Sequence, residues 1–129
     1  MDTSLRWLTK AVNLVRGFHH LYGGQGKVDR MTTENRLWQE LSQMANRQFP
    51  AAARAGGFPI VHNHCFLRVV YDHLFEKKWQ EVLDPKKPAY RQLDETQLRR
   101  AIAIGHEVMA DRERCEIMNA RSLRWRGKG

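Results

Sequence analysis

The sequence has no apolar stretch long enough to cross a membrane, and it has very little cysteine. A membrane-spanning helix needs roughly 20 consecutive apolar residues, but Arg68 and Asp72 interrupt the most apolar segment of this chain. Cys65 lies in an apolar context and Cys115 in a charged one, and the N-terminus lacks the charged start and apolar core of a signal peptide. We therefore expect a reduced, cytoplasmic protein with no membrane partner.

Acidic residues are scarce, and one long segment has none. The chain of 129 residues contains 22 Lys and Arg against 14 Asp and Glu, which gives a net charge of +8. No Asp or Glu occurs between Glu40 and Asp72, a segment that contains Arg47, Arg54 and Arg68. An excess of positive charge favours polyanionic partners. The composition thus predicts that the partner is nucleic acid or an acidic protein surface.

Internal repeats, low-complexity tracts and the alternating pattern of β-strands are also absent, whereas the apolar spacing of helices recurs along the chain. A chain of 129 residues is long enough to form one globular domain with a hydrophobic core. We predict an all-α, single-domain bundle of four to five helices. Residues 1–120 are expected to form the bundle and residues 121–129 a basic C-terminal tail.

Capping residues and prolines delimit the predicted helices. The starts are expected after Asp2, Thr3 or Ser4, at Thr32 or Thr33, near Asn63, at Asp94 and after Asp111, and the last helix is expected to end at about Asn119. The second helix should stop before Pro50, because a residue that precedes proline disfavours helical backbone. Asp94 followed by Gln97 has the spacing of a capping box.

Four consecutive residues, His62, Asn63, His64 and Cys65, stand at the start of the third predicted helix. Asn63 is a preferred N-cap residue, since its side-chain oxygen can accept hydrogen bonds from the amides of the first turn. His62 and His64 could instead chelate a metal, but a catalytic zinc needs three protein ligands and a structural one four. No Cys-x-x-Cys or His-Glu-x-x-His spacing supplies the others. We predict an Asn63 cap, no metal and no cofactor.

A catalytic interpretation of the same region stays open. Cys65 could act as a nucleophile with a neighbouring histidine as its base, and Asp72 beside His73 could support proton transfer. Arg68 and Asp72 also have the i,i+4 spacing of a structural ion pair. The candidate catalytic residues are His62, His64, Cys65, Arg68, Asp72 and His73. They do not decide whether the protein is an enzyme.

The C-terminal residues alternate cations with large apolar side chains. Arginine and lysine can contact phosphates there, and Trp125 can stack on a base or a guanidinium. Leu123 and Trp125 could instead dock the tail on the bundle. The predicted nucleic-acid-binding residues are Arg47, Arg54, Arg121, Arg124, Trp125, Arg126 and Lys128.

We therefore expect a small basic protein that binds nucleic acid, or is associated with it as an accessory protein, through Arg and Lys contacts to phosphate and through the Arg/Trp tail. Two alternatives remain. One is a small helical enzyme or metal-binding protein centred on His62, His64, Cys65 and Asp72. The other is an interaction module that docks on an acidic partner protein.

Overall fold

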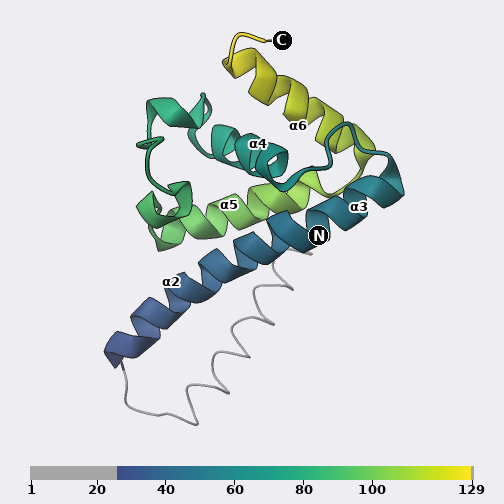
Figure 1. Ribbon diagram of the computed structural model, residues 1–129. Helices are drawn as coiled ribbons and strands as arrows, with labels where there is room; N and C mark the ends of the chain where they lie inside the picture. The colour runs from purple at the N-terminus through teal and green to yellow at the C-terminus, as the bar shows by residue number, and fades with distance from the viewer. Residues whose placement is uncertain (1–25, 129) are drawn as a thin grey trace.

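The computed structural model describes residues 26–128, and their fold is all-α (Figure 1). The α-helices are α2 (Gly26–Gln43), α3 (Phe49–Gly56), α4 (Asn63–Phe75), α5 (Glu95–Val108) and α6 (Arg112–Trp125). A π-helical turn, η1 (Met44–Gln48), joins α2 to α3, and two 3-10 turns, η2 (Trp79–Glu81) and η3 (Ala89–Gln92), lie between α4 and α5. Residues 26–128 contain no strand, which confirms the predicted fold class. Within the same residues, no helix combines the length and the apolar character needed to cross a membrane.

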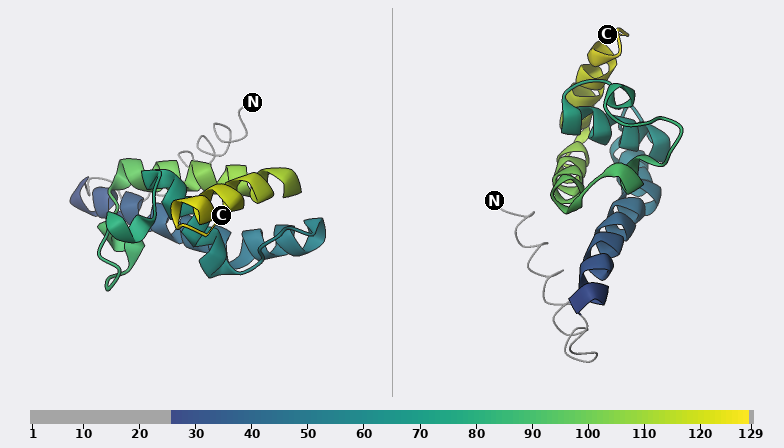
Figure 2. Two further views of the ribbon diagram at one scale, coloured as in Figure 1. Left: turned by 90° about the horizontal axis from the view of Figure 1, so that it is seen from above. Right: turned by 90° about the vertical axis from the view of Figure 1, so that its left-hand side faces the viewer.

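Helix α4 lies at the centre of the described fold, where it packs against α5, α6, η1 and η2. Its side chains Phe66, Val69 and Val70 are completely buried, and they join buried residues from the other helices in one apolar core. In Figures 1 and 2, α2 extends beyond this core at one end of the molecule and α6 reaches the opposite end. The buried residues of α4 are therefore positioned by contacts from several other elements.

Helix α5 approaches the core closely at Gly105. A Cβ atom on this glycine would lie 2.5 Å from Met44 Sδ and 3.0 Å from Phe66 Cζ. Glycine disfavours the interior of a helix, but here its missing side chain allows η1 and α4 to contact the α5 backbone. The Gly105 position thus helps to fix where α4 sits.

Helix α2 begins earlier than predicted, and its continuation runs further. It starts at Gly26 rather than at Thr32 or Thr33, and helical backbone continues past Pro50 through η1 and α3. Pro50 fits because it occupies the first turn of α3, where its missing N–H is not needed. The π-helical turn just before it changes the hydrogen-bonding register. The predicted stop before Pro50 is therefore wrong, and the chain leaves the helix only at Gly57, which has a left-handed φ of 64°.

Other predicted boundaries can be compared directly with the structure. Helix α4 begins at Asn63, near the predicted start. Helix α5 has the predicted capping box. In it, Asp94 Oδ1 accepts a hydrogen bond from the Gln97 backbone N–H at 2.8 Å, and Gln97 Oε1 accepts one from the Asp94 backbone N–H at 3.0 Å. The predicted end at about Asn119 is wrong, because α6 continues to Trp125. The first residues of the predicted tail are thus helical. The first predicted helix lies outside the described residues.

Candidate functional site

Asp72 is a fully buried carboxylate that ties α4 to α6 and η2. Its Oδ2 accepts hydrogen bonds from the Ser122 hydroxyl at 2.7 Å and from Arg126 Nε at 2.7 Å. Its Oδ1 accepts from Arg126 Nη2 at 3.0 Å and from the Trp79 backbone N–H at 2.9 Å. The two carboxylate oxygens offer about four lone-pair sites, so these donors satisfy them. The Asp72 carboxylate therefore holds three elements together and is not open to a substrate.

Arg68 does not form the ion pair with Asp72 that the i,i+4 spacing predicts. Its Nη2 donates to Asn119 Oδ1 on α6 instead. The Arg126 guanidinium contacts both oxygens of the Asp72 carboxylate, and such paired contacts are stronger than a single one. Arg68 stays partly exposed, and its Nε has no hydrogen-bond partner among the described residues.

His73 faces the interior of the bundle. Its Nδ1 lies 2.8 Å from the carbonyl oxygen of Val69, and the Trp125 ring packs edge-on against it with the ring centroids 5.0 Å apart. Burial is the main cause that lowers the pKa of His73 below its usual range; the Val69 hydrogen bond opposes it, and the charge of Arg121 adds to it. The neutral ring donates from Nδ1 to Val69. Its Nε2 therefore carries no proton.

No side chain caps the start of α4. The N-cap residue is His62, which has an extended backbone with φ −91° and ψ 149°, and no side chain accepts from the amides of the first turn. An N-cap needs this non-helical backbone, whereas Asn63 is already helical. The Asn63 Nδ2 donates instead to Asn46 Oδ1 at 2.7 Å. The predicted Asn63 cap is therefore wrong. His62 and His64 are exposed, with their rings stacked at 5.5 Å between centroids.

The candidate catalytic residues do not share one pocket. Those at the start of α4 reach solvent, whereas those two turns later are enclosed by the bundle. The exposed or partly exposed residues are His62, His64, Cys65 and Arg68, and the buried ones are Asp72 and His73. In the part of the chain that the structure describes, no three His, Cys, Asp or Glu side chains are grouped as metal ligands.

The predicted nucleic-acid-binding residues also fall into two sets. Arg47 in η1, Arg54 in α3, and Arg124 and Lys128 near the C-terminus are exposed, whereas Arg121, Trp125 and Arg126 are partly buried. Trp125 packs against a buried histidine and Arg126 pairs with a buried carboxylate. The start of the predicted tail is therefore docked on the bundle. Trp125 and Arg126 therefore stabilise the fold.

A groove of about 490 Å³ lies between the first turns of α4 and the connection from η2 to η3. Aromatic side chains from Tyr71, Trp79 and Tyr90 line it, together with the cations Arg68 and Lys87. Its lining also includes His64, Cys65 and Arg126, so it brings together residues from both predicted sets. No Asp or Glu is among the described residues that line the groove.

Contacts between rings hold the aromatic side of the groove in place. The Tyr71 and Trp79 rings meet edge to face with centroids 6.0 Å apart, and Tyr90 stacks on Trp38 of α2 at 4.3 Å. Burial raises the pKa of Tyr71 to about 12, so its phenol stays protonated at neutral pH. Trp79 and Tyr90 remain partly exposed. The groove thus has a wall of rings held by aromatic contacts beside the cations Arg68 and Lys87.

The groove residues that sequence reasoning missed include the cation Lys87 and the rings of Trp79 and Tyr90. A local pattern was available, because a pair of lysines precedes each aromatic residue, in "KKW" and in "KKPAY". Cations interleaved with aromatic residues are the pattern that pointed to the C-terminal tail. The same pattern therefore occurs in the connection between α4 and α5.

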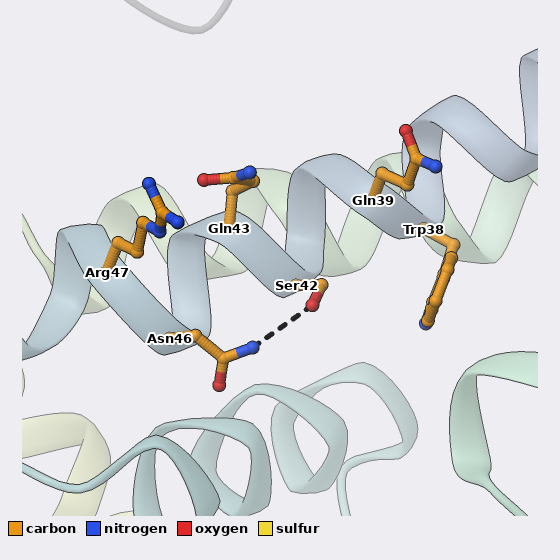
Figure 3. Close-up of a pocket in the computed structure, with 6 residues that line it drawn as sticks. All are labelled: Trp38, Gln39, Ser42, Gln43, Asn46 and Arg47. Carbon is orange, nitrogen blue, oxygen red and sulfur yellow. Dashed lines mark hydrogen bonds between the residues drawn. The ribbon is translucent and has the colours of Figure 1, made fainter.

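A second hollow, of about 520 Å³, lies along α2 and η1 (Figure 3). Figure 3 shows the side chains that line it, which are Trp38, Gln39, Ser42, Gln43, Asn46 and Arg47. Two contacts connect it with the groove: the stacking of Trp38 on Tyr90, and the hydrogen bond from Asn63 to Asn46, next to His64. We call the groove and this hollow together the linked surface.

The described residues of the linked surface supply cations, amides and aromatic rings, and none of them is acidic. Cations attract phosphates and carboxylates, while rings and amides can contact flat polar molecules. What this surface can bind must be inferred from these groups. Comparisons with models of protein families, with curated protein sequences and with solved structures found no match to this chain.

Proposed function

We propose that the protein binds nucleic acid through the linked surface. The observation that carries the proposal is a surface with cations beside aromatic rings and with no acidic side chain among its described residues. Arg47, Arg68 and Lys87 supply charge, and Trp79 and Tyr90 supply rings. Nucleic acid is the polyanion whose recognition uses both kinds of group.

The charge distribution supports the same proposal. The segment from 41 to 71, which has no carboxylate, forms the end of α2, η1, α3 and the first turns of α4. It contributes residues to both parts of the linked surface. A phosphate backbone that approaches this segment meets arginines and histidines from a stretch of chain without acids, and Glu34 lines a neighbouring hollow that shares Trp38 and Tyr90. Exposed Arg54, Arg124 and Lys128 can add phosphate contacts outside the linked surface.

Binding of labelled DNA and RNA, each as a single strand and as a duplex, tests the proposal by fluorescence anisotropy at two salt concentrations. We expect binding that weakens with salt, with the logarithm of the association constant falling by about 0.9 per phosphate contact on duplex DNA and by about 0.7 on a single strand. No binding at low salt would contradict the proposal.

Two arginine variants distinguish binding at the linked surface from attraction to the net charge of the whole protein. Arg47→Glu should weaken binding to all sequences and reduce the salt slope by about one contact. Arg112→Glu is the matched control, because Arg112 is also exposed but pairs with Glu116 on α6 and lines neither hollow. It should have a smaller effect. If polyglutamate displaces the labelled nucleic acid as well as unlabelled nucleic acid does, the result would favour an acidic protein partner and count against the proposal.

A further inference from the structure

We infer that the groove binds one unstacked nucleotide of a single strand, with the base against Trp79 and the phosphate at Arg68 and Lys87. The inference rests on the proposed function, and it adds the form of the nucleic acid and the place where a base is held. It follows from three features of the groove: the arrangement of its rings, the state of its cations and its size.

The rings favour a base that is not part of a duplex. Trp79 is partly exposed, and its edge-to-face contact with Tyr71 fixes its orientation in the groove. A base can stack on such a ring only if one of its own faces is free, whereas bases in a duplex are covered by their neighbours on both faces. Stacking on aromatic side chains is the usual way in which proteins hold single strands, and it tolerates any base.

Two cations line the same groove as the rings and are the candidates to contact the phosphate of the held nucleotide. Lys87 is exposed at the edge of the groove, and Arg68 reaches it from α4. The bond from Arg68 Nη2 to Asn119 orients the guanidinium, whose Nε is buried, so a phosphate would be met by the rest of the guanidinium. A planar guanidinium that is already oriented loses little freedom when it binds a phosphate. Arg126, by contrast, is engaged by Asp72 and Gln80.

The size of the groove agrees with one nucleotide. Its volume of about 490 Å³ is in the range of sites that hold small molecules, which is the size class of a single nucleotide. The strand on either side of the held nucleotide would continue along the protein surface.

Two adjacent lysines provide the sharpest test. Lys86 and Lys87 are both exposed, but only Lys87 lines the groove. With a short labelled oligothymidylate, Lys87→Ala should reduce the salt slope by about 0.7, the value for one phosphate contact on a single strand, while Lys86→Ala should leave it unchanged. Both variants change the surface alone, so the comparison does not depend on a change in folding.

Variants of Trp79 test the stacked base. Trp79→Leu should weaken single-strand binding by about tenfold and affect duplex binding less, whereas Trp79→Phe, which keeps a ring, should retain most of the affinity. Thymidine monophosphate should compete weakly for the groove. If it binds as tightly as the strand, the ligand is a free nucleotide and the inference is wrong.

The remaining outcomes separate this inference from the proposed function. Equal effects of Lys86→Ala and Lys87→Ala, together with equal affinity for strand and duplex, would overturn the inference and leave nucleic-acid binding standing. Absence of binding to every nucleic acid at low salt would overturn both. Single-strand preference with a selective loss in Lys87→Ala is the result we expect.

Discussion

The two halves of helix α4 carry similar polar residues but use them in different ways. In the second half, Asp72 and His73 are buried, and groups on α6, η2 and the α4 backbone engage them. In the first half, His64 and Arg68 reach solvent and line the groove. The second half therefore makes buried contacts that stabilise the bundle, whereas the first half lines an open groove, where Arg68 also bonds to Asn119 of α6. Neighbouring elements, not the type of residue, make this difference.

Loss of the Asp72 charge should have the largest effect on the stabilising half. Asp72→Asn leaves the Arg126 guanidinium, whose side chain is only 15% exposed, beside a neutral amide. Removing one partner of a buried ion pair costs about 3–5 kcal/mol. We expect a loss of this size in the free energy of unfolding, measured by urea denaturation at neutral pH. In the double variant Asp72→Asn/Arg126→Met, the loss should be smaller than the sum of the single losses.

The ion pair between Arg112 and Glu116 is the control for this prediction. Its N–O distance is 3.2 Å, and the two side chains are 66% and 50% exposed. Because solvent screens such a pair, Glu116→Gln should reduce the free energy of unfolding by less than about 1 kcal/mol. If Asp72→Asn were equally mild, the Asp72 network would not hold α4 to α6. The carboxylate would then return as a candidate catalytic group.

A smaller effect should come from His73, through the pH dependence of stability. Burial lowers the pKa of His73 in the folded chain, whereas in the unfolded chain the pKa is near the ordinary value of about 6.5. As the pH falls below that value, the unfolded chain takes up a proton that the folded chain excludes. The free energy of unfolding should therefore be highest above about pH 6.5 and decrease until the pH has passed the lower pKa of the folded chain.

Urea denaturation at a series of pH values checks this decrease. His73→Asn, whose side-chain amide can still donate to the Val69 carbonyl, should make the loss at acidic pH smaller. Burial also lowers the pKa of His106, so part of the dependence should persist in that variant and decrease again when His106→Asn is added. An unchanged pH dependence in His73→Asn would show that His73 is not the buried neutral group described above.

The sequence predicted the architecture better than the site, because architecture depends more on local patterns. The all-α class follows from apolar spacing, and the α5 capping box follows from two residues three positions apart. The Asp72 network, by contrast, joins Asp72 to Ser122 and Arg126, which are 50 and 54 positions away. The i,i+4 rule placed Arg68 next to Asp72, but it could not show that a distant arginine makes the better contact.

The groove depends on distant contacts in the same way. Trp79 and Tyr90 meet α4 because the connection between α4 and α5 folds back, with Trp79 held through its backbone N–H by Asp72 and Tyr90 through stacking on Trp38. A lysine pair precedes each aromatic residue in the sequence, but this local pattern does not show where the segment lies in the fold. Local rules also fail at Pro50, where the preceding π-helical turn lets the helical path continue.

The smallest change in the free energy of unfolding is expected for Asn63, at the start of α4, where the N-cap residue makes no side-chain hydrogen bond. Asn63→Ala removes the exposed hydrogen bond to Asn46, a loss of about 0.5–1.5 kcal/mol at most, and it gains about 0.5 kcal/mol from the higher helix propensity of alanine. The net change in the free energy of unfolding should therefore be close to zero. In an Asn46→Ala background the bond is already lost, so Asn63→Ala should then be neutral or slightly stabilising. Loss of an N-cap would instead cost about 1 kcal/mol in either background, and that result would contradict the backbone assignment of His62 as the cap.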